Sequence, residues 1–564
     1  MSNNKQKLEL TWIGKNNPEY DIASIEPRIL EERVDLSHGD KDTENMIIHG
    51  DNLLALKALL PEYEEKIKCI YIDPPFNTGA AFDHYDDSTE HSTWLSLMKS
   101  RLDFFVKLLS SEGSIFVHLD DNESDYLKVL MDETFGRKNF VGRITIDARS
   151  PSAFSTVNPG VFKASEYILW YAKDKTNFSE NSMRIKRQPN YAYNRWLDNP
   201  EDDFTKWTFR SLTDAYAEAP KSRTARPDKL IEHFNAFIVN NAKQIWRSTE
   251  ISDTGAGRAT IEIKQQSLKE PERVFRLERN GYDPIYILNG TQIAFYSKNV
   301  HEVDGEMSAT TFLTNIWSDI AWEGIAGEGG IQFKKGKKPE KLIKRCLDLA
   351  SKENDFVLDS FLGSGTTASV AHKMGRKYIG IEMGEHAYTH VQKRMKDVVD
   401  GKDQAGVSKT IGWKGGGGFK FYELAPSFVV IDEFGNPVID SYYNDTKLIR
   451  AMCKLTNYTF APNPTNYWKH GKGQGNNSIY VTTQMLSVAM VQQIVSHLGT
   501  NETLLICPKK FEHGCENVDA RITIKKIPQS ILKACQFGKK EYLLPIKERA
   551  MEEVDEDEVD SDEN

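Results

Sequence analysis

The chain has 564 residues, of which 39% are hydrophobic and 10% aromatic, enough for two to four domains with real cores. No run approaches the ~18–20 apolar residues of a membrane span, and the polar start MSNNKQKLEL has no secretory h-region, so we expect a cytoplasmic protein without a membrane partner. The net charge is −10, but nine acidic residues lie in the final stretch EEVDEDEVDSDEN, so the near-neutral body neither supports nor excludes a nucleic-acid partner.

The first third of the chain alternates helical and strand patterns. After an N-terminal arm at 1–45, leucines at helical spacing follow an Asp51/Asn52 cap and end at Pro61. A strand at 67–72, a long amphipathic helix within 91–113, and strands at 114–120 and 166–174 come next. This alternation predicts βαβ units and a mostly parallel sheet in the segment 46–177.

The rest of the chain divides by composition. Residues 178–312 mix polar, aromatic and basic sequence and read as an insert with its own fold, and the α/β rhythm returns at 313–411. The run GWKGGGGF predicts a flexible hinge at 412–424. A C-terminal α+β domain is expected at 425–550 and a disordered acidic tail at 551–564.

Cysteine spacing predicts no special chemistry. The six cysteines are scattered, with no CxxC pair and no His cluster at ligand spacing. Neither a disulfide frame nor a metal site is expected, and the thiols should be buried or idle.

The stretch YIDPPFNTG at 71–79 ends the strand at 67–72 abruptly. Proline fixes φ and has no N–H, so Pro74 and Pro75 hold Asp73 and Phe76 on a stiff corner. A bare tetrapeptide of this kind is also a common strand-ending turn. A functional interpretation therefore needs a partner site elsewhere.

That partner site lies in NDFVLDSFLGSGTTASVAHKMGRKYIGIEM, residues 354–383. A buried strand ends in Asp359, a turn carries Gly363 and Gly365, a helix begins at Thr366, and the next strand ends in Glu382. Glycines allow close approach of backbone to a ligand, and an acid at the next strand end can accept hydrogen bonds from ribose. The turn lacks the lysine of a Walker A loop and the third glycine of a dinucleotide site, which favours another nucleoside cofactor.

The two motifs together resemble the amino-methyltransferases that use S-adenosyl-L-methionine, in the permuted β-class order with the catalytic motif first. Further stretches resemble the modification subunit of type III restriction-modification systems. These are LELTWIGK at 8–15, HGDNLLAL at 49–56, SEYILWYAKD at 165–174, KKPEKLI at 337–343 and GWKGGGGFKFYEL at 412–424. The resemblance implies a Rossmann-like α/β methyltransferase core in which the insert at 178–312 recognises the target.

Roles for individual residues follow from this resemblance. Asp73 and the Pro74 carbonyl would accept hydrogen bonds from the N6 amine of adenine, with Pro75 fixing the corner and a flipped base stacking on Phe76. The family usually has tyrosine in place of Phe76, and phenylalanine keeps the ring. The cofactor-binding set would be Asp51, Asp359, Phe361, Gly363, Gly365, Thr366 and Glu382. Asp51 is explained equally well as a helix N-cap. The resemblance also places Lys338 and Pro339 beside the methionine tail of the cofactor, and a plain helix N-terminus explains these two residues nearly as well.

The predicted function is methylation of adenine N6 in double-stranded DNA, as subunit of a type III system. The alternatives are an enzyme that methylates cytosine-N4, RNA or a protein amide, and a DNA-recognition subunit whose main role is to recruit a nuclease-translocase. A homodimer, seated in the C-terminal domain, and a separate restriction subunit are expected partners. Basic residues of the insert are candidates for DNA contacts, with a solvated surface as the alternative: Arg184, Lys186, Arg187, Arg195, Lys221, Arg223 and Arg226.

Overall fold

A computed structural model describes residues 9–17, 21–77, 91–149, 161–219, 227–322, 324–331, 333, 336–431, 437–443 and 445–527. The chain divides into two compact units, residues 1–181 with 315–564, and residues 182–314. The expected acidic tail, and Lys221, Arg223, Arg226 and Cys535, lie outside the described residues. The five described cysteines are free thiols and are buried: Cys69, Cys346, Cys453, Cys507 and Cys515.

The larger unit is built on a mixed sheet whose strands lie in the order β1-β20-β3-β19-β18-β4-β5-β7-β6-β17, with β2 paired to β20. The six central strands from β20 to β5 run parallel, whereas β7 is antiparallel to both β5 and β6. The bounds are β1 Leu30–Glu32, β2 His38–Gly39, β3 Met46–His49, β4 Ile67–Ile72, β5 Leu109–Leu119, β6 Phe140–Asp147, β7 Ser165–Ala172, β17 Ile316–Trp317, β18 Phe356–Asp359, β19 Lys377–Glu382 and β20 Gly418–Leu424.

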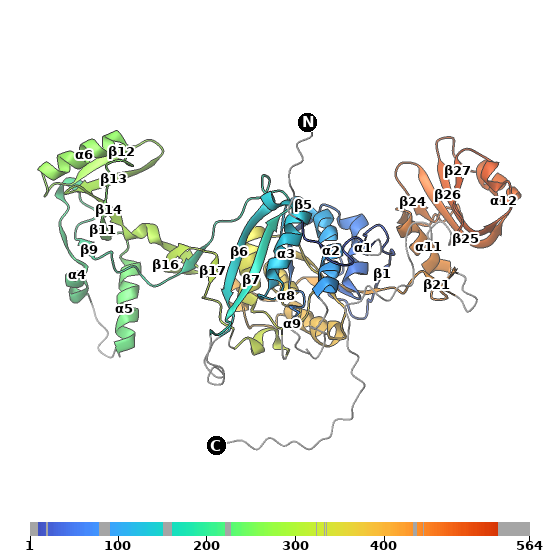
Figure 1. The fold of residues 1–564 in the computed structure, drawn as a ribbon, viewed down its shortest axis with the longest axis horizontal. Helices are drawn as coiled ribbons and strands as arrows, with labels where there is room; N and C mark the ends of the chain where they lie inside the picture. The colour runs from blue at the N-terminus through green and yellow to red at the C-terminus, as the bar shows by residue number, and fades with distance from the viewer. Residues whose placement is uncertain are drawn as a thin grey trace, which may run out of the picture. The chain divides into compact units, whose positions relative to one another are not determined.

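Helices cover both faces of this sheet (Figure 1). Ile70 and Ile72 of β4 belong to a core cluster with the first three helices. Their neighbours Cys69 and Tyr71 point to the opposite face, where α7 packs against β4 and β5. The helix bounds are α1 Asn52–Tyr63, α2 His91–Leu108, α3 Ser124–Met131, α7 Glu340–Ala350, α8 Thr366–Lys373, α9 Lys393–Val399 and α10 Ser408–Ile411.

The adjacency of β18 and β4 decides where the motifs meet. Leu358 of β18 is in register with Ile70 of β4, and the two strands run parallel. Asp359 ends β18, and Asp73 follows the end of β4. Because the carboxyl ends of parallel strands lie at one edge of a sheet, the two motifs, far apart in sequence, share that edge.

The predicted glycine hinge at 412–424 is wrong for its second half. Gly418–Leu424 forms β20, which pairs with β3 on one side and with β1 of the N-terminal arm on the other. A side chain at Gly418 would collide with the backbone of Asp40. The glycine is therefore explained by close packing beneath the arm, and composition alone misread it as flexibility.

A smaller five-stranded sheet follows, in the order β23-β24-β25-β26-β27. β25, β26 and β27 are parallel, and α11 and α12 pack with this sheet around two apolar clusters. The bounds are β21 Val429–Ile431, β22 Pro437–Ile439, α11 Asp445–Leu455, β23 Thr459–Phe460, β24 Gly471–Lys472, β25 Asn477–Leu486, α12 Val488–Ser496, β26 Thr503–Phe511 and β27 Ile522–Ile524.

The smaller unit, residues 182–314, has a six-stranded sheet in the order β10-β9-β11-β14-β13-β12 and a three-stranded sheet in the order β15-β16-β8. Its bounds are β8 Arg184–Lys186, β9 Arg195–Leu197, β10 Phe209–Ser211, α4 Leu212–Glu218, α5 Pro227–Asn240, β11 Ile245–Glu250, α6 Arg258–Lys269, β12 Phe275–Arg279, β13 Tyr282–Leu288, β14 Thr291–Phe295, β15 Val300–Val303 and β16 Glu306–Phe312. Within the described parts of the chain, no helix has both the length and the apolar character needed to cross a membrane.

Candidate functional site

The corner after β4 is held in place from two sides. The indole Nε1–H of Trp94 donates a hydrogen bond of 2.9 Å to the Pro75 carbonyl. Asn77 adopts a positive φ of 58° and donates from Nδ2 to Glu123 Oε1 at 2.7 Å. The prolines and these two anchors together leave the corner little conformational freedom.

Asp73 has one occupied and one vacant carboxylate oxygen. Its Oδ2 lies 2.8 Å from the Lys338 ammonium, in an ion pair whose side chains are 10% exposed for lysine and 19% for aspartate. Its Oδ1 is buried and has no hydrogen-bond partner among the described residues. A buried carboxylate oxygen without a donor is costly, and at a strand end it marks a place where a ligand can supply that donor.

Phe76 lies beside the same lysine. The Lys338 ammonium is 4.8 Å from the centroid of the Phe76 ring. His118, at the end of β5, has its ring 5.9 Å from Phe76 and 6.4 Å from Trp322. Lys338 thus contacts both Asp73 and Phe76, and His118 links the Phe76 ring to Trp322.

The turn after β18 is fixed by Glu382 at the end of β19. One oxygen of Glu382 accepts a hydrogen bond from the Gly363 N–H at 2.7 Å, and the other accepts from the Met383 and Gly384 N–H groups at 2.8 and 2.9 Å. His386 Nε2 lies 3.0 Å from the same carboxylate. The carboxylate thereby ties the turn after β18 to the next strand.

Both glycines of the turn have positive φ, 53° at Gly363 and 79° at Gly365, a conformation that L side chains rarely adopt. A Cβ at Gly363 would have its nearest neighbour, the Phe361 carbonyl oxygen, 3.9 Å away. The backbone at Gly363 is therefore open to close approach by a ligand.

Asp359 is buried at the head of this turn. Its Oδ1 accepts a hydrogen bond of 2.9 Å from the Phe361 N–H. Burial raises the pKa of Asp359 to about 7, although hydrogen bonds from the Thr367 side chain and the Phe361 backbone act in the opposite direction. A nearby cation would favour its ionised form.

Asp51 acts as the N-cap of α1, accepting a hydrogen bond of 3.0 Å from the Leu54 N–H. Burial raises its pKa, while Arg101, 3.8 Å away, lowers it. The next residue, Asn52, donates to the Ser360 carbonyl at 2.8 Å. The segment at 49–56 therefore braces the turn after β18, and capping is the observed role of Asp51.

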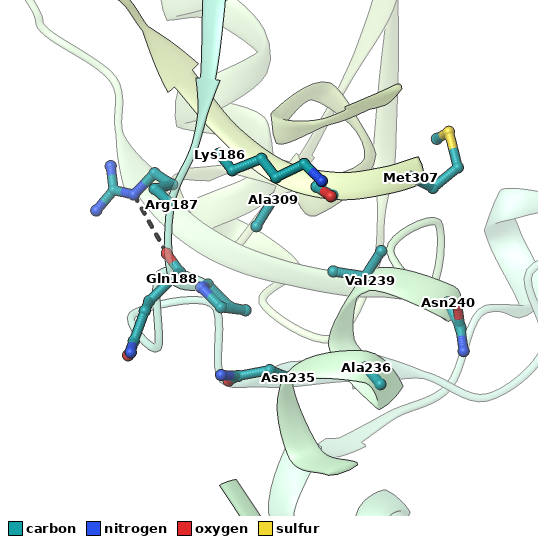
Figure 2. A pocket seen from close by; sticks show the side chains of 11 residues that line it. Lys186, Arg187, Gln188, Asn235, Ala236, Val239, Asn240, Met307 and Ala309 are labelled. Atoms are coloured by element: carbon teal, nitrogen blue, oxygen red, sulfur yellow. Dashed lines mark hydrogen bonds between the residues drawn. The ribbon is translucent and has the colours of Figure 1, made fainter. Parts of the chain in front are cut away.

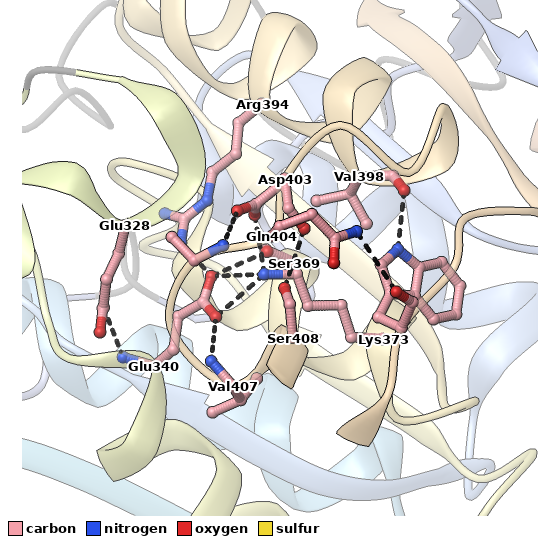
Figure 3. A network of polar contacts seen from close by, with 12 residues as sticks. Glu328, Glu340, Ser369, Lys373, Arg394, Val398, Asp403, Gln404, Val407 and Ser408 are labelled. Carbon is pink, nitrogen blue, oxygen red and sulfur yellow. Dashed lines mark hydrogen bonds and ion pairs between the residues drawn. The ribbon is translucent and has the colours of Figure 1, made fainter. Parts of the chain in front are cut away.

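Thr366, predicted beside the cofactor, is hydrogen-bonded to a member of a buried ion network. Figure 3 shows this network around Glu340, Lys373, Arg394 and Asp403. Its hydroxyl accepts a hydrogen bond of 2.9 Å from Arg394, which also pairs with Glu340 at 2.7 Å. Lys373 bridges Glu340 at 2.9 Å and Asp403 at 2.7 Å, and all four ionic side chains are inaccessible to solvent. The network joins α7, α8 and α9 beneath the turn.

Sequence reasoning missed Glu166 and His118. Glu166 Oε2 lies 2.9 Å from His118 Nε2, and Tyr71 is hydrogen-bonded to His118 Nδ1 at 2.9 Å. Burial raises the pKa of Glu166, but Lys338, His118 and Arg149 outweigh it and hold the value at about 2. The available signal was position, since His118 is near the end of β5 and Glu166 is the second residue of β7, which is antiparallel to β5.

The smaller unit contains an open groove of about 510 Å³ between β8, α5 and β16 (Figure 2). Its polar lining includes Lys186, Arg187, Gln188, Asn235 and Asn240. Two other predicted basic residues lie nearby in sequence: the Arg184 guanidinium is 4.0 Å from the centroid of the Phe312 ring, and Arg195 is exposed on β9. Cations and amides in one groove suit the recognition of nucleic-acid backbone and base edges.

A family model described as "DNA methylase" matches residues 67–393. The HindVI Mod subunit of Haemophilus influenzae, a probable type III restriction-modification enzyme, is 35% identical over 68% of this chain and 54% of its own length. The EcoPI Mod subunit of Escherichia phage P1 is 26% identical over 67% of this chain and 62% of its own length. The matches thus span little more than half of these two relatives. Among solved structures, the M1.HpyAVI–SAM complex is 14% identical, covering 62% of this chain and 98% of that one, with a TM-score of 0.29, too low to add to the argument.

Proposed function

The chain belongs to the DNA methylase family, and we propose that it transfers a methyl group from S-adenosyl-L-methionine to the 6-amino group of adenine in double-stranded DNA. We further propose that it is the modification and recognition subunit of a type III restriction-modification system, the class named for its 35% identical relative. We also propose that the reaction takes place in the cytoplasm.

The observation that carries the proposal is the vacant Oδ1 of Asp73. This buried acceptor lies at the same sheet edge as the glycine turn after β18. An amine that reaches it would form the hydrogen bond that Oδ1 lacks among the described residues. The site therefore suits a substrate that brings N–H donors, as the exocyclic amine of a base does.

Asp73 and Pro74 would prepare the amine for reaction. The amine is a poor nucleophile because its lone pair is conjugated with the ring. N–H groups that donate to Asp73 Oδ1 and to the Pro74 carbonyl pull the nitrogen toward tetrahedral geometry and release that lone pair. The negative charge of Asp73 also stabilises the positive charge that develops on nitrogen.

The residues of the turn fit the cofactor on the observations above. Gly363 leaves room for close approach, Glu382 holds the turn and is proposed to bind the ribose, and the buried carboxyl of Asp359 suits a cationic ligand. Phe361, Gly365 and Thr366 complete the proposed set. S-adenosyl-L-methionine supplies an electrophilic methyl group when it is bound.

A base inside a duplex must leave the stack to reach Asp73, at a cost of a few kcal/mol. Stacking on Phe76 would offset about 1–3 kcal/mol of that cost. We propose that the groove in the smaller unit contributes to DNA recognition, with Arg187 suited to guanine or phosphate and Asn235 to adenine. A homodimer and a separate nuclease-translocase subunit remain proposals.

The test is methylation of duplex DNA by the purified protein, followed by digestion to nucleosides and mass spectrometry. We expect N6-methyl-2′-deoxyadenosine that depends on the cofactor. N4-methyl-2′-deoxycytidine would instead assign cytosine as the target base. Absence of methylation of any duplex that the folded protein binds would overturn the proposal and direct the search to RNA or protein amides.

A further inference from the structure

Lys338 lies beside the position that the proposed reaction reserves for the target amine. It lies in the segment before α7, and its ammonium is 2.8 Å from Asp73 Oδ2. The same ammonium is 4.8 Å from the centroid of the Phe76 ring. A base that stacks on Phe76 would have to displace the ammonium from the ring, and its amine would then donate to Asp73 Oδ1.

We propose that Lys338 holds the base subsite in the free protein, through Asp73 Oδ2 and the Phe76 ring, and moves to Glu166 when the flipped base enters. This inference rests on the proposed function, because it takes Asp73 and Phe76 as the base-binding residues. It adds to that function a residue with which the incoming base must compete.

Glu166 offers the lysine a second anionic partner. Its side chain is 8% exposed, with His118 Nε2 at 2.9 Å and Arg149 at 3.8 Å. Burial lowers the pKa of Lys338, but Asp73 and then Glu166 raise it, so the net shift is upward. Both carboxylates therefore act on the ammonium and favour its charged form.

The exchange leaves each buried charge with a hydrogen-bond partner. In the free protein Lys338 neutralises Asp73. After exchange the amine of the base donates to Asp73 while Lys338 pairs with Glu166. A base without an exocyclic amine would displace the lysine without replacing its hydrogen bond to Asp73. Since a buried charge without a partner is strongly unfavourable, entry of such a base is disfavoured. The lysine thereby couples base entry to the presence of an amine.

The experiment measures base flipping with 2-aminopurine placed beside the target adenine, in a duplex that carries the site methylated by the wild-type protein. Lys338→Met removes the competitor, and we expect the flipping equilibrium to shift toward the flipped base by about tenfold, the usual effect of one charge-assisted hydrogen bond. Glu166→Gln removes the second partner, and we expect a shift in the opposite direction. Lys341→Gln, an exposed lysine on α7, is the matched control and should behave as wild type.

Opposite responses of Lys338→Met and Glu166→Gln support the inference, and Lys338→Arg, which retains the charge, should stay near wild type. Parallel losses of flipping in the two variants would identify a purely structural role. Unchanged flipping with weakened binding of S-adenosyl-L-methionine by Lys338→Met would instead assign the lysine to the cofactor. Methylation by wild type on the same DNA tests the proposed function separately, so failure of the two ideas can be told apart.

Discussion

The two carboxylates Glu382 and Asp73 are both associated with strand ends of one sheet, yet their oxygens have different surroundings. Glu382 accepts three backbone N–H groups and lies beside His386. Asp73 has a lysine at one oxygen, and its other, buried oxygen has no hydrogen-bond partner among the described residues. The turn after β18 is thus fixed by hydrogen bonds, whereas in the proposed function the corner after β4 is completed by a donor of the substrate.

Removal of the Asp73 charge should impair catalysis and leave cofactor binding nearly unchanged. For Asp73→Asn we expect kcat to fall about 10³-fold, the scale of losing a preorganised catalytic group. The dissociation constant for S-adenosyl-L-methionine should change less than about twofold, because Asp73 is not among the groups that hold the turn. Steady-state kinetics and calorimetry measure both quantities.

Glu112→Gln is the control for this variant, since Glu112 is an exposed carboxylate of β5 paired with Lys68. A kcat for Asp73→Asn within tenfold of wild type would contradict the assigned role.

The buried network beneath the turn should contribute mainly to stability. Lys373→Met leaves Glu340 and Asp403 buried with one cation fewer, and we expect the free energy of unfolding to fall by about 3–5 kcal/mol. Lys344→Met, which breaks the partly exposed pair with Asp348, should cost less than about 1 kcal/mol. Urea unfolding compares the two, and equal losses would count against a special role for the network.

Glu382→Gln should damage the cofactor side selectively. An amide has a single acceptor oxygen and loses the charge, so hydrogen bonds worth about 1.5–3 kcal/mol are weakened. We expect cofactor affinity to fall about 10- to 100-fold, with kcat at saturating cofactor within a few-fold of wild type. Isothermal calorimetry with S-adenosyl-L-methionine provides the affinity. Unaltered binding would show that the turn does not depend on its carboxylate.

Cofactor binding should depend on pH through Asp359. Burial raises its pKa to about 7, so the carboxyl is largely protonated in the free protein at lower pH. A cationic cofactor favours the ionised form, so binding releases a proton and affinity rises with pH by about tenfold per unit at most, levelling off above about pH 7. Calorimetry in two buffers of different ionisation enthalpy measures the released proton, and Asp359→Asn should abolish the release.

The smallest effect is expected at the anchor of the catalytic corner. Trp94→Phe removes the hydrogen bond to the Pro75 carbonyl while keeping an aromatic ring in the core. We expect kcat to fall about fivefold, the scale of one neutral hydrogen bond of about 1 kcal/mol, and cofactor affinity to remain unchanged. A larger loss of affinity than of kcat would mean that the corner and the turn are not independent.

The two strand ends could be predicted from the sequence because the signal for each lies within one short stretch of the chain. An apolar run that ends in an acid followed by prolines or glycines identifies β4 with Asp73 and β18 with Asp359 without knowledge of the fold. The partnership of Lys338 with Asp73 and Glu166 was not accessible in this way, since it depends on the order of β18, β4, β5 and β7.

The error at 412–424 has a similar physical origin. A glycine required by close packing and a glycine in a flexible linker have the same composition, and only the neighbouring strand β2 distinguishes them at Gly418. Asp51 is a second case of this kind. An aspartate is expected both at a helix N-cap and at a ligand contact, so the residue type alone does not distinguish the two roles.

The most direct test of the central claim is expression of the wild-type protein and Asp73→Asn in a host that lacks its own adenine methylases, with modified bases read by native single-molecule sequencing. We predict N6-methyladenine at one recurrent asymmetric sequence for the wild type and none for the variant. An unmodified genome with folded wild-type protein present, or equal modification by Asp73→Asn, would contradict the account.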